Sequence, residues 1–452
     1  MSVPQTRKVL ALALVAGLGF SLAACGEDKG SNAKVTITVD CMPVEAQKEL
    51  RADWLADVDA FQKLHPNITI KSISVGSQCN NPPDFTARLR GGTQADVFYA
   101  YMTDLQQVLD SGQAQDISQY INDETVPTWN SIDGVTKTAF AEGGKTYGIP
   151  TKNYTMGLVI NKPLFKAAGL DPAKPPSSWA DVRSAAAAIA RATPGTYGYG
   201  EYSAQNTGGW HFTATMYGLG GSMVTPDGKK ANFNNDLGKS ILQNLKDMRA
   251  ANSVGDKQLL GWGDLLTLAG AGKVGMFLGA PDATTAIVTQ FKGKYEDWAM
   301  GPLPGKDGAG AASLGGGEGY FFKKGLSAEQ IKAGLMWLSY EKLTPGKGQF
   351  DYVRAKPEKQ PVGLPQPQLF SVGSAAEKQE TDLKKANANI TVADFEPFAS
   401  KPITIKLEPP QAQAIYAVLD GPMSAVLTDP NADINKLLSD AEAKVNTILA
   451  NG

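Results

Sequence analysis

The amino-acid sequence predicts an α/β protein whose parallel sheet is covered by helices, and two observations lead to this fold class. Strand-like and helix-like segments alternate between residues 35 and 101, as they do in βαβ units. About 428 residues follow a short N-terminal segment, which is enough chain for a large core and for two domains. No internal repeat and no low-complexity block interrupts this pattern.

The N-terminal segment, residues 1–24, has the pattern of a secretory signal peptide. Arg7 and Lys8 precede an uncharged stretch of about 14 residues, which is shorter than the roughly 20 residues that span a bilayer. This stretch ends in Leu-Ala-Ala-Cys, which resembles a bacterial lipobox, so we expect cleavage before Cys25 and lipidation of its sulfur. Two or more acyl chains would anchor the chain stably to a membrane. The alternative is an ordinary secretion signal that happens to end near a cysteine.

The composition of the remaining chain excludes several classes of function. Residues 25–33 are polar and predict a flexible tether. Removing residues 1–24, which carry two positive charges and no negative ones, changes the formal net charge from −2 to −4, which gives no electrostatic case for binding nucleic acid. His65 and His211 are the only histidines, and neither stands in a metal-ligand spacing. We therefore expect no metal, no cofactor and no histidine-dependent catalysis.

Cys41 and Cys79 remain as a pair once Cys25 is lipidated. Each follows a strand-like run with alternating apolar residues, VTITV in the first case and ITIKSISV in the second. If these strands are neighbours in one parallel sheet, their carboxyl ends meet and bring the two thiols together. A disulfide there would close a loop of about 38 residues and contribute roughly 3–4 kcal/mol in an oxidising compartment. The alternative is a buried pair of free thiols.

Helical segments separate and follow these strands. Leu50, Trp54, Val58 and Phe61 recur every three or four residues and form one apolar helix face. A short helix and the strand ADVFYAY come next, and three further helices are predicted at residues 177–192, 236–251 and 327–341. The last of these begins with a capping box formed by a serine and a glutamine. Trp54, Trp179 and Trp337 lie on helix faces and are expected in the core.

Residues 147–182 resemble the signature stretch of the extracellular solute-binding proteins of ABC importers, the carbohydrate-type family that includes maltose-binding protein. The matching residues are Tyr147-Gly148-Ile149-Pro150, Asn161-Lys162, Ala168-Gly169-Leu170, Pro175-Pro176 and Trp179. The segments GAGKVGMFLG, WAMGPLPG, LGGGEGYFFKKGLSAEQIKAGLMWLSY and SDAEAKVNTIL follow in the order typical of this family, so the resemblance covers nearly the whole exported chain.

The resemblance implies a periplasmic-binding-protein-like fold of two discontinuous α/β lobes around a central ligand cleft. We expect lobe 1 at 34–147 with 303–348, and lobe 2 at 148–302 with 349–452. The lobes would close on a ligand that contacts both of them. The implied protein is a monomer that is anchored by lipid to the outer face of the cytoplasmic membrane and delivers its ligand to the permease subunits of an ABC importer.

Candidate ligand-binding residues lie near the carboxyl ends of the predicted strands, where α/β sheets bind ligands. Tyr99 and Tyr101 straddle the end of one strand, although either could be a core residue. Lys152, Asn153 and Tyr154 stand where the family crosses between lobes, and their alternative role is hinge structure alone.

Four further candidates come from loops. Trp210 follows two glycines, and Asp282 replaces an aromatic residue that the family often has at this position, so it weakens the expectation of sugar stacking there. Gly317 and Glu318 follow a glycine run that could bring backbone amides close to a ligand, or could simply form a tight turn. Trp262 and Tyr416 are weaker candidates.

A match to the dinucleotide fingerprint GxGxxG at residues 270–275 is rejected. That fingerprint requires a strand before the glycines and a helix after them. Here WGDLLTLA predicts a helix before them and VGMFLG predicts an extended segment after them. We expect these glycines to end a helix instead.

The sequence thus predicts a non-enzymatic receptor that captures a sugar or an oligosaccharide. One alternative is a membrane-anchored carbohydrate hydrolase, for which Glu201, Asp282 and Glu318 could supply paired carboxylates. Another is a receptor for a polyol, a phosphodiester or a polyamine. A polyamine site would need several carboxylates near aromatic residues, whereas a phosphate site would need Arg or Lys, for which Lys152 and Arg354 are available.

Overall fold

A computed structural model describes residues 34–451 of the chain, except residues 77–78, 256–258, 356–359, 367 and 401–403. The expected signal peptide, the lipidation site Cys25 and the tether lie outside the described residues. Val35–Gly452 forms one compact unit, and the description below concerns that unit alone.

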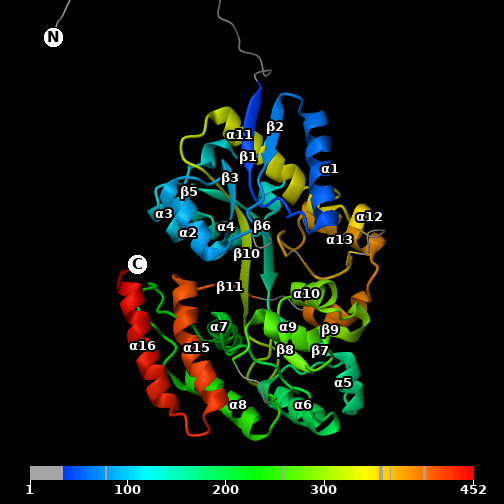
Figure 1. The fold of residues 1–452 in the computed structure, drawn as a ribbon, viewed down its shortest axis with the longest axis vertical. Coiled ribbons are helices and arrows are strands. Elements are labelled where there is room, and N and C mark those ends of the chain that lie inside the picture. Colours follow the sequence, from blue (N-terminus) through cyan, green and yellow to red (C-terminus); the bar gives the residue numbers. More distant parts are fainter. Residues whose placement is uncertain are drawn as a thin grey trace, which may run out of the picture. The chain divides into compact units, whose positions relative to one another are not determined.

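The larger sheet contains the three strands that the N-terminal pattern predicts, and they are parallel as expected. Its order is β11-β10-β3-β1-β2, and β6 pairs with the edge of β10 opposite to β3. β10 is antiparallel to both β3 and β6, and it is parallel to β11 (Figure 1). The strands are β1 (Val35–Val39), β2 (Ile68–Ser72), β3 (Val97–Tyr101), β6 (Gly148–Thr155), β10 (Ser313–Phe322) and β11 (Ile405–Leu407).

Helices cover both faces of this sheet because its strands are apolar on both sides. Tyr99 and Tyr320 point into one core cluster, which also contains Phe61 of α1 and Trp337 of α11. Phe98 points into a second cluster on the opposite face. The surrounding elements are α1 (Lys48–Leu64), α2 (Pro82–Gly91), α3 (Leu105–Asp110), α4 (Gly134–Thr138), β4 (Ala141–Glu142), β5 (Lys145–Thr146), α11 (Ala328–Leu338), α12 (Tyr352–Ala355) and α13 (Ala375–Asn387).

A second group of elements surrounds a three-stranded antiparallel sheet of order β8-β7-β9. Leu158 and Val159 of β7 point to opposite faces, each of which is covered by helices. The strands are β7 (Gly157–Asn161), β8 (Met276–Gly279) and β9 (Trp298–Gly301). The helices are α5 (Lys162–Ala167), α6 (Trp179–Ala192), α7 (Thr207–Gly218), α8 (Asp236–Ala250), α9 (Trp262–Gly270), α10 (Asp282–Phe291), α14 (Glu396–Ala399), α15 (Ala412–Thr428) and α16 (Ile434–Asn451).

Several expectations about local structure are confirmed. Trp54, Trp179 and Trp337 are buried in the core. Helix α9 ends at Gly270, and β8 follows at Met276, so the glycine-rich match between them ends a helix and cannot be a dinucleotide fingerprint. One expectation is wrong, because Leu50 is 46% exposed, although it was placed on the apolar face of its helix.

The disulfide between Cys41 and Cys79 is present, as the pairing of β1 with β2 predicts. The two Cα atoms are 4.9 Å apart. Cys41 has a positive φ of 68°, so the chain turns sharply just after β1 and directs this side chain toward the end of β2. The bond therefore fixes the loops at the carboxyl ends of both strands.

Asp40, directly after β1, is a buried carboxyl group beneath the end of β3. Its Oδ1 atom accepts a hydrogen bond of 2.7 Å from the backbone N–H of Tyr99, and its exposed fraction is 2%. Burial raises the pKa of Asp40 from 3.8 to about 7, although the Tyr99 N–H and the charge of Arg88 act in the opposite direction.

We expect Asp40 to make the protein less stable as the pH rises. Its pKa is higher in the folded state, so folding binds a proton, and the stability present below pH 3.8 is lost as the pH rises toward about 7. The Asp40→Asn variant lacks this loss. The difference in free energy of unfolding, variant minus natural protein, should therefore be about 2–4 kcal/mol larger at pH 8 than at pH 4. Urea unfolding at both pH values measures the difference. A difference that does not change with pH would contradict the assignment.

Candidate ligand-binding pocket

A pocket of about 340 Å³ lies where β3, β6 and β10 meet α7, α10 and α15. Eight of the nine residues expected to bind a ligand line this pocket, although they come from five separate parts of the chain. They are Tyr99, Tyr101, Lys152, Tyr154, Trp210, Asp282, Gly317 and Glu318. The remaining lining residues are Thr103, Gln205, Asn206, Thr207, Glu408, Gln413 and Tyr416.

Asn153 is the one expected residue that the structure does not bring to the pocket. Side chains alternate along β6, so Lys152 and Tyr154 face the pocket while Asn153 faces the opposite side. Asn153 is fully buried, and its Nδ2 atom donates a 2.9 Å hydrogen bond to Oγ1 of Thr136. Its position is therefore that of a core residue that ties β6 to α4.

The glycines of β10 permit the close pairing of β10 with β6. A Cβ atom on Gly317 would lie 2.0 Å from the carbonyl oxygen of Lys152, and one on Gly316 would lie 2.5 Å from the hydroxyl oxygen of Tyr154. Larger residues at these positions would displace β6 or the Tyr154 ring. Gly317 does line the pocket, but the reason for a glycine at this position is the close approach of β6, which leaves no room for a Cβ atom.

The end of β3 forms an aromatic wall. The rings of Tyr99 and Tyr101 meet edge to face at 5.6 Å, and the hydroxyl of Tyr99 donates a 2.5 Å hydrogen bond to Oε2 of Glu318. Burial and then the negative charge of Glu318 raise the pKa of Tyr101 to about 12, so its hydroxyl keeps its proton at neutral pH. Both hydroxyls therefore remain hydrogen-bond donors.

Lys152 lies between two carboxylates at the base of the pocket. It stands opposite Glu318 in the register of β6 and β10. Burial would lower its pKa, but the negative charges of Glu318 and Asp282 outweigh that effect and raise it. The ammonium group is therefore charged at neutral pH.

The opposite wall contains two expected residues, Tyr154 and Trp210, the weaker candidate Tyr416, and Glu408, which sequence reasoning missed. Tyr154 and Trp210 meet edge to face at 6.3 Å, and the hydroxyl of Tyr416 donates a 3.0 Å hydrogen bond to Oε1 of Glu408. Glu408 follows the short strand β11 and precedes two prolines, so a carboxylate after a strand-like run was the available signal. Trp262 does not line the pocket and packs against Phe291 instead.

Glu201, which was considered as a catalytic carboxylate, is occupied elsewhere. It is buried, and its Oε1 atom lies 2.5 Å from Nδ1 of His211 and accepts a hydrogen bond from the backbone N–H of Tyr202. It does not reach the pocket, so Asp282 and Glu318 are the two proposed carboxylates that remain there.

The loop before α7 is held in place by Asp420 of α15. Gln205 and Asn206, which line the pocket, have positive φ angles of 58° and 67°, which are unfavourable for residues other than glycine. The Asp420 carboxylate accepts hydrogen bonds from the backbone N–H groups of Asn206 (2.6 Å) and Gly209 (3.0 Å). It thus caps α7 from another helix and offsets the strain of the loop.

We expect Asp420→Asn to loosen this loop, because a neutral amide accepts these hydrogen bonds more weakly than a carboxylate. The free energy of unfolding should fall by about 1.5–3 kcal/mol. Amide hydrogen exchange at residues 206–209 should accelerate, and mass spectrometry measures it. Asp440→Asn, which removes an exposed carboxylate from α16, is the control and should change neither quantity. Unchanged exchange in Asp420→Asn would contradict the role of Asp420.

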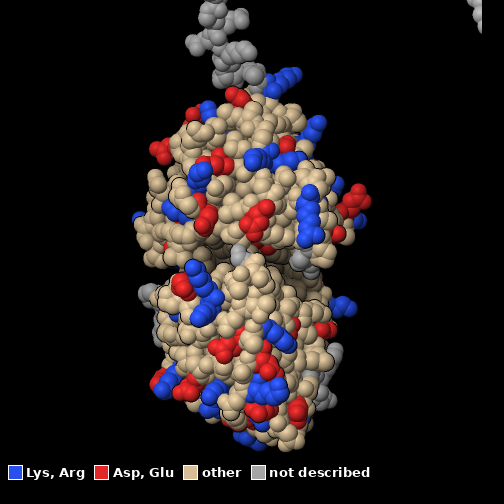
Figure 2. All heavy atoms as spheres, turned by 90° about the vertical axis from the view of Figure 1, so that its left-hand side faces the viewer, with Lys and Arg blue, Asp and Glu red and all other residues tan. Residues whose placement is uncertain are grey.

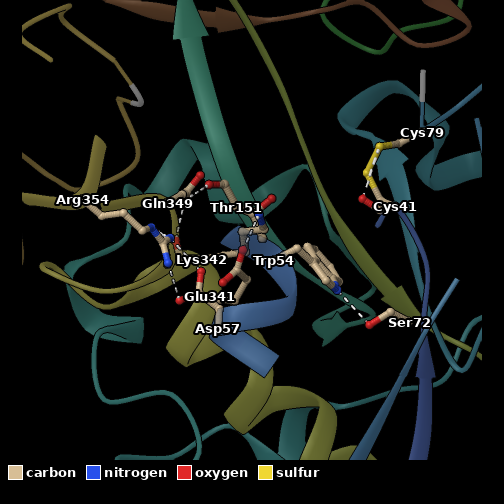
Figure 3. Close-up of polar contacts among 11 residues, drawn as sticks. Cys41, Trp54, Asp57, Ser72, Cys79, Thr151, Glu341, Lys342, Gln349 and Arg354 are labelled. Atoms are coloured by element: carbon tan, nitrogen blue, oxygen red, sulfur yellow. Dashed lines mark hydrogen bonds and ion pairs between the residues drawn. A yellow bond between two sulfur atoms is a disulfide. The ribbon is translucent and has the colours of Figure 1, made fainter. Parts of the chain in front are cut away.

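A second chamber of about 300 Å³ adjoins the pocket, and Tyr99 and Glu318 line both spaces. We call it the acidic chamber because Asp53, Asp57, Glu341 and Asp351 line it together with the cations Lys342 and Arg354. Figure 3 shows Arg354 and Asp57 pointing toward one another, and their two hydrogen bonds measure 2.9 and 2.8 Å. Gln349 donates a 2.8 Å hydrogen bond to the backbone carbonyl of Thr151 on β6.

Three further observations concern surface charge, helix length and clusters of metal-binding side chains in the described part of the chain. On the face drawn in Figure 2, basic and acidic side chains are interspersed and not separated by sign. None of the described helices is long and apolar enough to cross a membrane. The described residues also contain no group of three or more His, Cys, Asp or Glu side chains that could hold a metal ion.

Comparisons with known proteins point to one family. Residues 47–337 match the family model of the bacterial extracellular solute-binding proteins. A Brucella abortus protein that is named as a binding protein is 27% identical over 286 residues, which are 61% of this chain. The match spans 64% of the length of that curated relative.

Solved structures confirm the predicted fold of two α/β lobes around a cleft. The cyclic α-maltosyl-1,6-maltose binding protein of Arthrobacter globiformis has a TM-score of 0.69 at 22% identity, covering 93% of this chain and 100% of that chain. A Mycobacterium tuberculosis protein in complex with glycerophosphocholine also has a TM-score of 0.69, at 16% identity, covering 93% of this chain and 99% of that chain. At these identities the likeness establishes the fold alone.

Proposed function

Because this chain belongs to the bacterial extracellular solute-binding protein family, we propose that it captures a sugar or an oligosaccharide and delivers it to the permease of an ABC importer. The main support is the composition of the pocket, in which five aromatic rings stand beside three carboxylates and one ammonium group. Aromatic faces pack against the C–H surfaces of sugars, and carboxylates accept hydrogen bonds from pairs of hydroxyls. A concave site in which aromatic rings stand beside polar groups that can orient a ligand is typical of small-molecule sites.

Lobe closure is the proposed mechanism of capture. Tyr99 belongs to the core cluster around the larger sheet, whereas Tyr154 and Trp210 pack against the cluster around β7. A ligand that contacts both walls would favour the closed arrangement, because only that arrangement satisfies both sets of contacts. β6 and β10 connect the two walls and are the proposed hinge.

We propose a later lobe boundary than the one expected at residue 349. Phe350, Tyr352 and Leu369 pack in the same cluster as Phe61, and Tyr352 hydrogen-bonds Glu380 of α13. Ile390 packs against the cluster around β9. Lobe 1 then comprises 34–147 and 303–387, and lobe 2 comprises 148–302 and 388–452.

The alternatives receive less support. A phosphodiester needs cationic partners, but Arg354 is engaged by Asp57 outside the pocket, which leaves Lys152 facing three carboxylates. The family and the structural relatives are binding proteins, so turnover is not expected. The remaining carboxylate pair, Asp282 and Glu318, lines the pocket together with Lys152, and both charges act on that ammonium group.

A thermal-unfolding screen against mono- and oligosaccharides tests the proposal. A sugar present at 100 times its dissociation constant should stabilise the protein by about 2.7 kcal/mol. Trp210→Ala should lose this stabilisation, because it removes a ring from the pocket wall. Trp129→Ala is the control, since Trp129 is a partly exposed indole outside the pocket, and it should respond like the natural protein. Stabilisation by no sugar, or cleavage of a labelled oligosaccharide, would contradict the proposal.

We further propose that the chain is exported and anchored through lipid on Cys25, which lies outside the described residues. The supporting observations are the lipobox-like sequence, the family of extracellular proteins, and the disulfide, which suits an oxidising compartment. Mass spectrometry of the N-terminal peptide from the native host should find a chain that begins at Cys25 and carries acyl groups. A Cys25→Ala variant should appear in the soluble fraction. An N-terminus without acyl groups would disprove the anchor.

A further inference from the structure

Glu408 is a carboxylate surrounded by tyrosines. Tyr416 donates a 3.0 Å hydrogen bond to its Oε1 atom. A Cβ atom added to Gly316 would lie 3.1 Å from Oε2 of Glu408 and 2.5 Å from the hydroxyl of Tyr154, so these two groups are neighbours. Tyr101 lines the same pocket as Glu408, and the hydroxyl of Tyr217 donates a 3.1 Å hydrogen bond to the backbone carbonyl of Leu407, the residue before Glu408.

No cation of the described chain compensates this carboxylate. Within the described ranges, none of Glu408, Glu318 and Asp282 forms an ion pair with a Lys, Arg or His side chain. Lys406 is close in sequence, but its Nζ atom donates a 2.9 Å hydrogen bond to the carbonyl of Gly221 and lies over the Tyr217 ring. Lys152 lines the same pocket as Glu408, but burial lowers its pKa and the charges that raise it are those of Glu318 and Asp282.

The acidic chamber, like the pocket, is lined by more carboxylates than cations. Five carboxylates, Glu318 among them, and two cations line it, and it shares Tyr99 and Glu318 with the pocket as lining residues. One of these carboxylates, Glu341, is 5% exposed, and its Oε2 atom has no hydrogen-bond partner among the described residues. The whole ligand space therefore carries more negative than positive charge.

Burial raises the pKa of Glu408 to about 7, which means that its ionised form is disfavoured in the pocket. A buried carboxylate without a cationic partner is unfavourable, and a ligand that supplies the positive charge stabilises the ionised form. An ammonium group is also attracted to the faces of tyrosine rings, most strongly where water is excluded. A neutral sugar would hydrogen-bond the carboxylates but would leave their charge uncompensated. An anionic ligand would be repelled.

Building on the proposed function, we propose that the captured saccharide bears a protonated amino group, which binds between Glu408 and the rings of Tyr101 and Tyr154. The sugar ring then extends toward Trp210 and Lys152. The ligand class is thus a cationic amino sugar, or an oligosaccharide that contains one.

Matched sugar pairs test this inference by titration calorimetry. Glucosamine is compared with glucose, which has no amine, and with N-acetylglucosamine, in which the amine is a neutral amide. The β-1,4-linked disaccharides of the same three sugars form a second set for the same comparison. We expect the amine-bearing member of a pair to bind roughly tenfold more tightly or better at neutral pH. This advantage should shrink as the salt concentration rises.

The Glu408→Gln variant locates the effect. It keeps the size of the side chain and removes the charge, so the ratio of the affinities for the amine-bearing and the neutral member of each pair should fall to about one. Glu49→Gln, an exposed substitution on α1, is the control and should keep the advantage. Circular dichroism establishes whether the Glu408→Gln variant is folded. If the variant is unfolded, the comparison of amine-bearing with N-acetylated sugars in the natural protein still tests the preference for an amine.

The outcomes separate this inference from the proposed function. Binding of neutral sugars with no preference for the amine would overturn the inference and leave the proposed function standing. An amine preference that survives Glu408→Gln would overturn the assignment to Glu408. Binding of none of the sugars would overturn the proposed function itself.

Discussion

The close pairing of β6 with β10 is the constraint on which the rest of the pocket depends. It requires glycine at Gly317 and Gly319, because Cβ atoms there would lie 2.0 and 2.3 Å from carbonyl oxygens of β6. This pairing sets Lys152 opposite Glu318 and joins the walls of the pocket through two continuous strands. In the proposed hinge, the register between β6 and β10 fixes which side chains of the two strands stand opposite one another.

The pocket walls carry features that are unfavourable for folding alone. Gln205 and Asn206 adopt positive φ angles, and burial raises the pKa of Glu408 to about 7. Asp420 offsets the first cost through hydrogen bonds to backbone N–H groups. Within the described chain no cation offsets the second, and such local conflicts are typical of functional sites. The imbalance is consistent with a ligand that supplies the missing charge.

Sequence reasoning found most of the pocket because strand ends are readable from periodicity. Tyr99 and Tyr101 follow a buried strand, and Lys152 and Tyr154 were identified through a family motif. It misplaced Asn153 because the side that a strand residue faces depends on which strand pairs with it. It missed Glu408 because β11 is three residues long and contributes only after it pairs with β10, far away in the sequence.

The sequence by itself determined the α/β class, the first three parallel strands, the pairing of Cys41 with Cys79 and the family. Each of these follows from local periodicity or from residues close together in the chain. Only the tertiary structure decided how β10 joins the two walls, where the chain leaves the first core cluster after residue 349, and which charges remain uncompensated. These features depend on contacts between residues hundreds of positions apart, and the energy of a buried charge is set by everything packed around it.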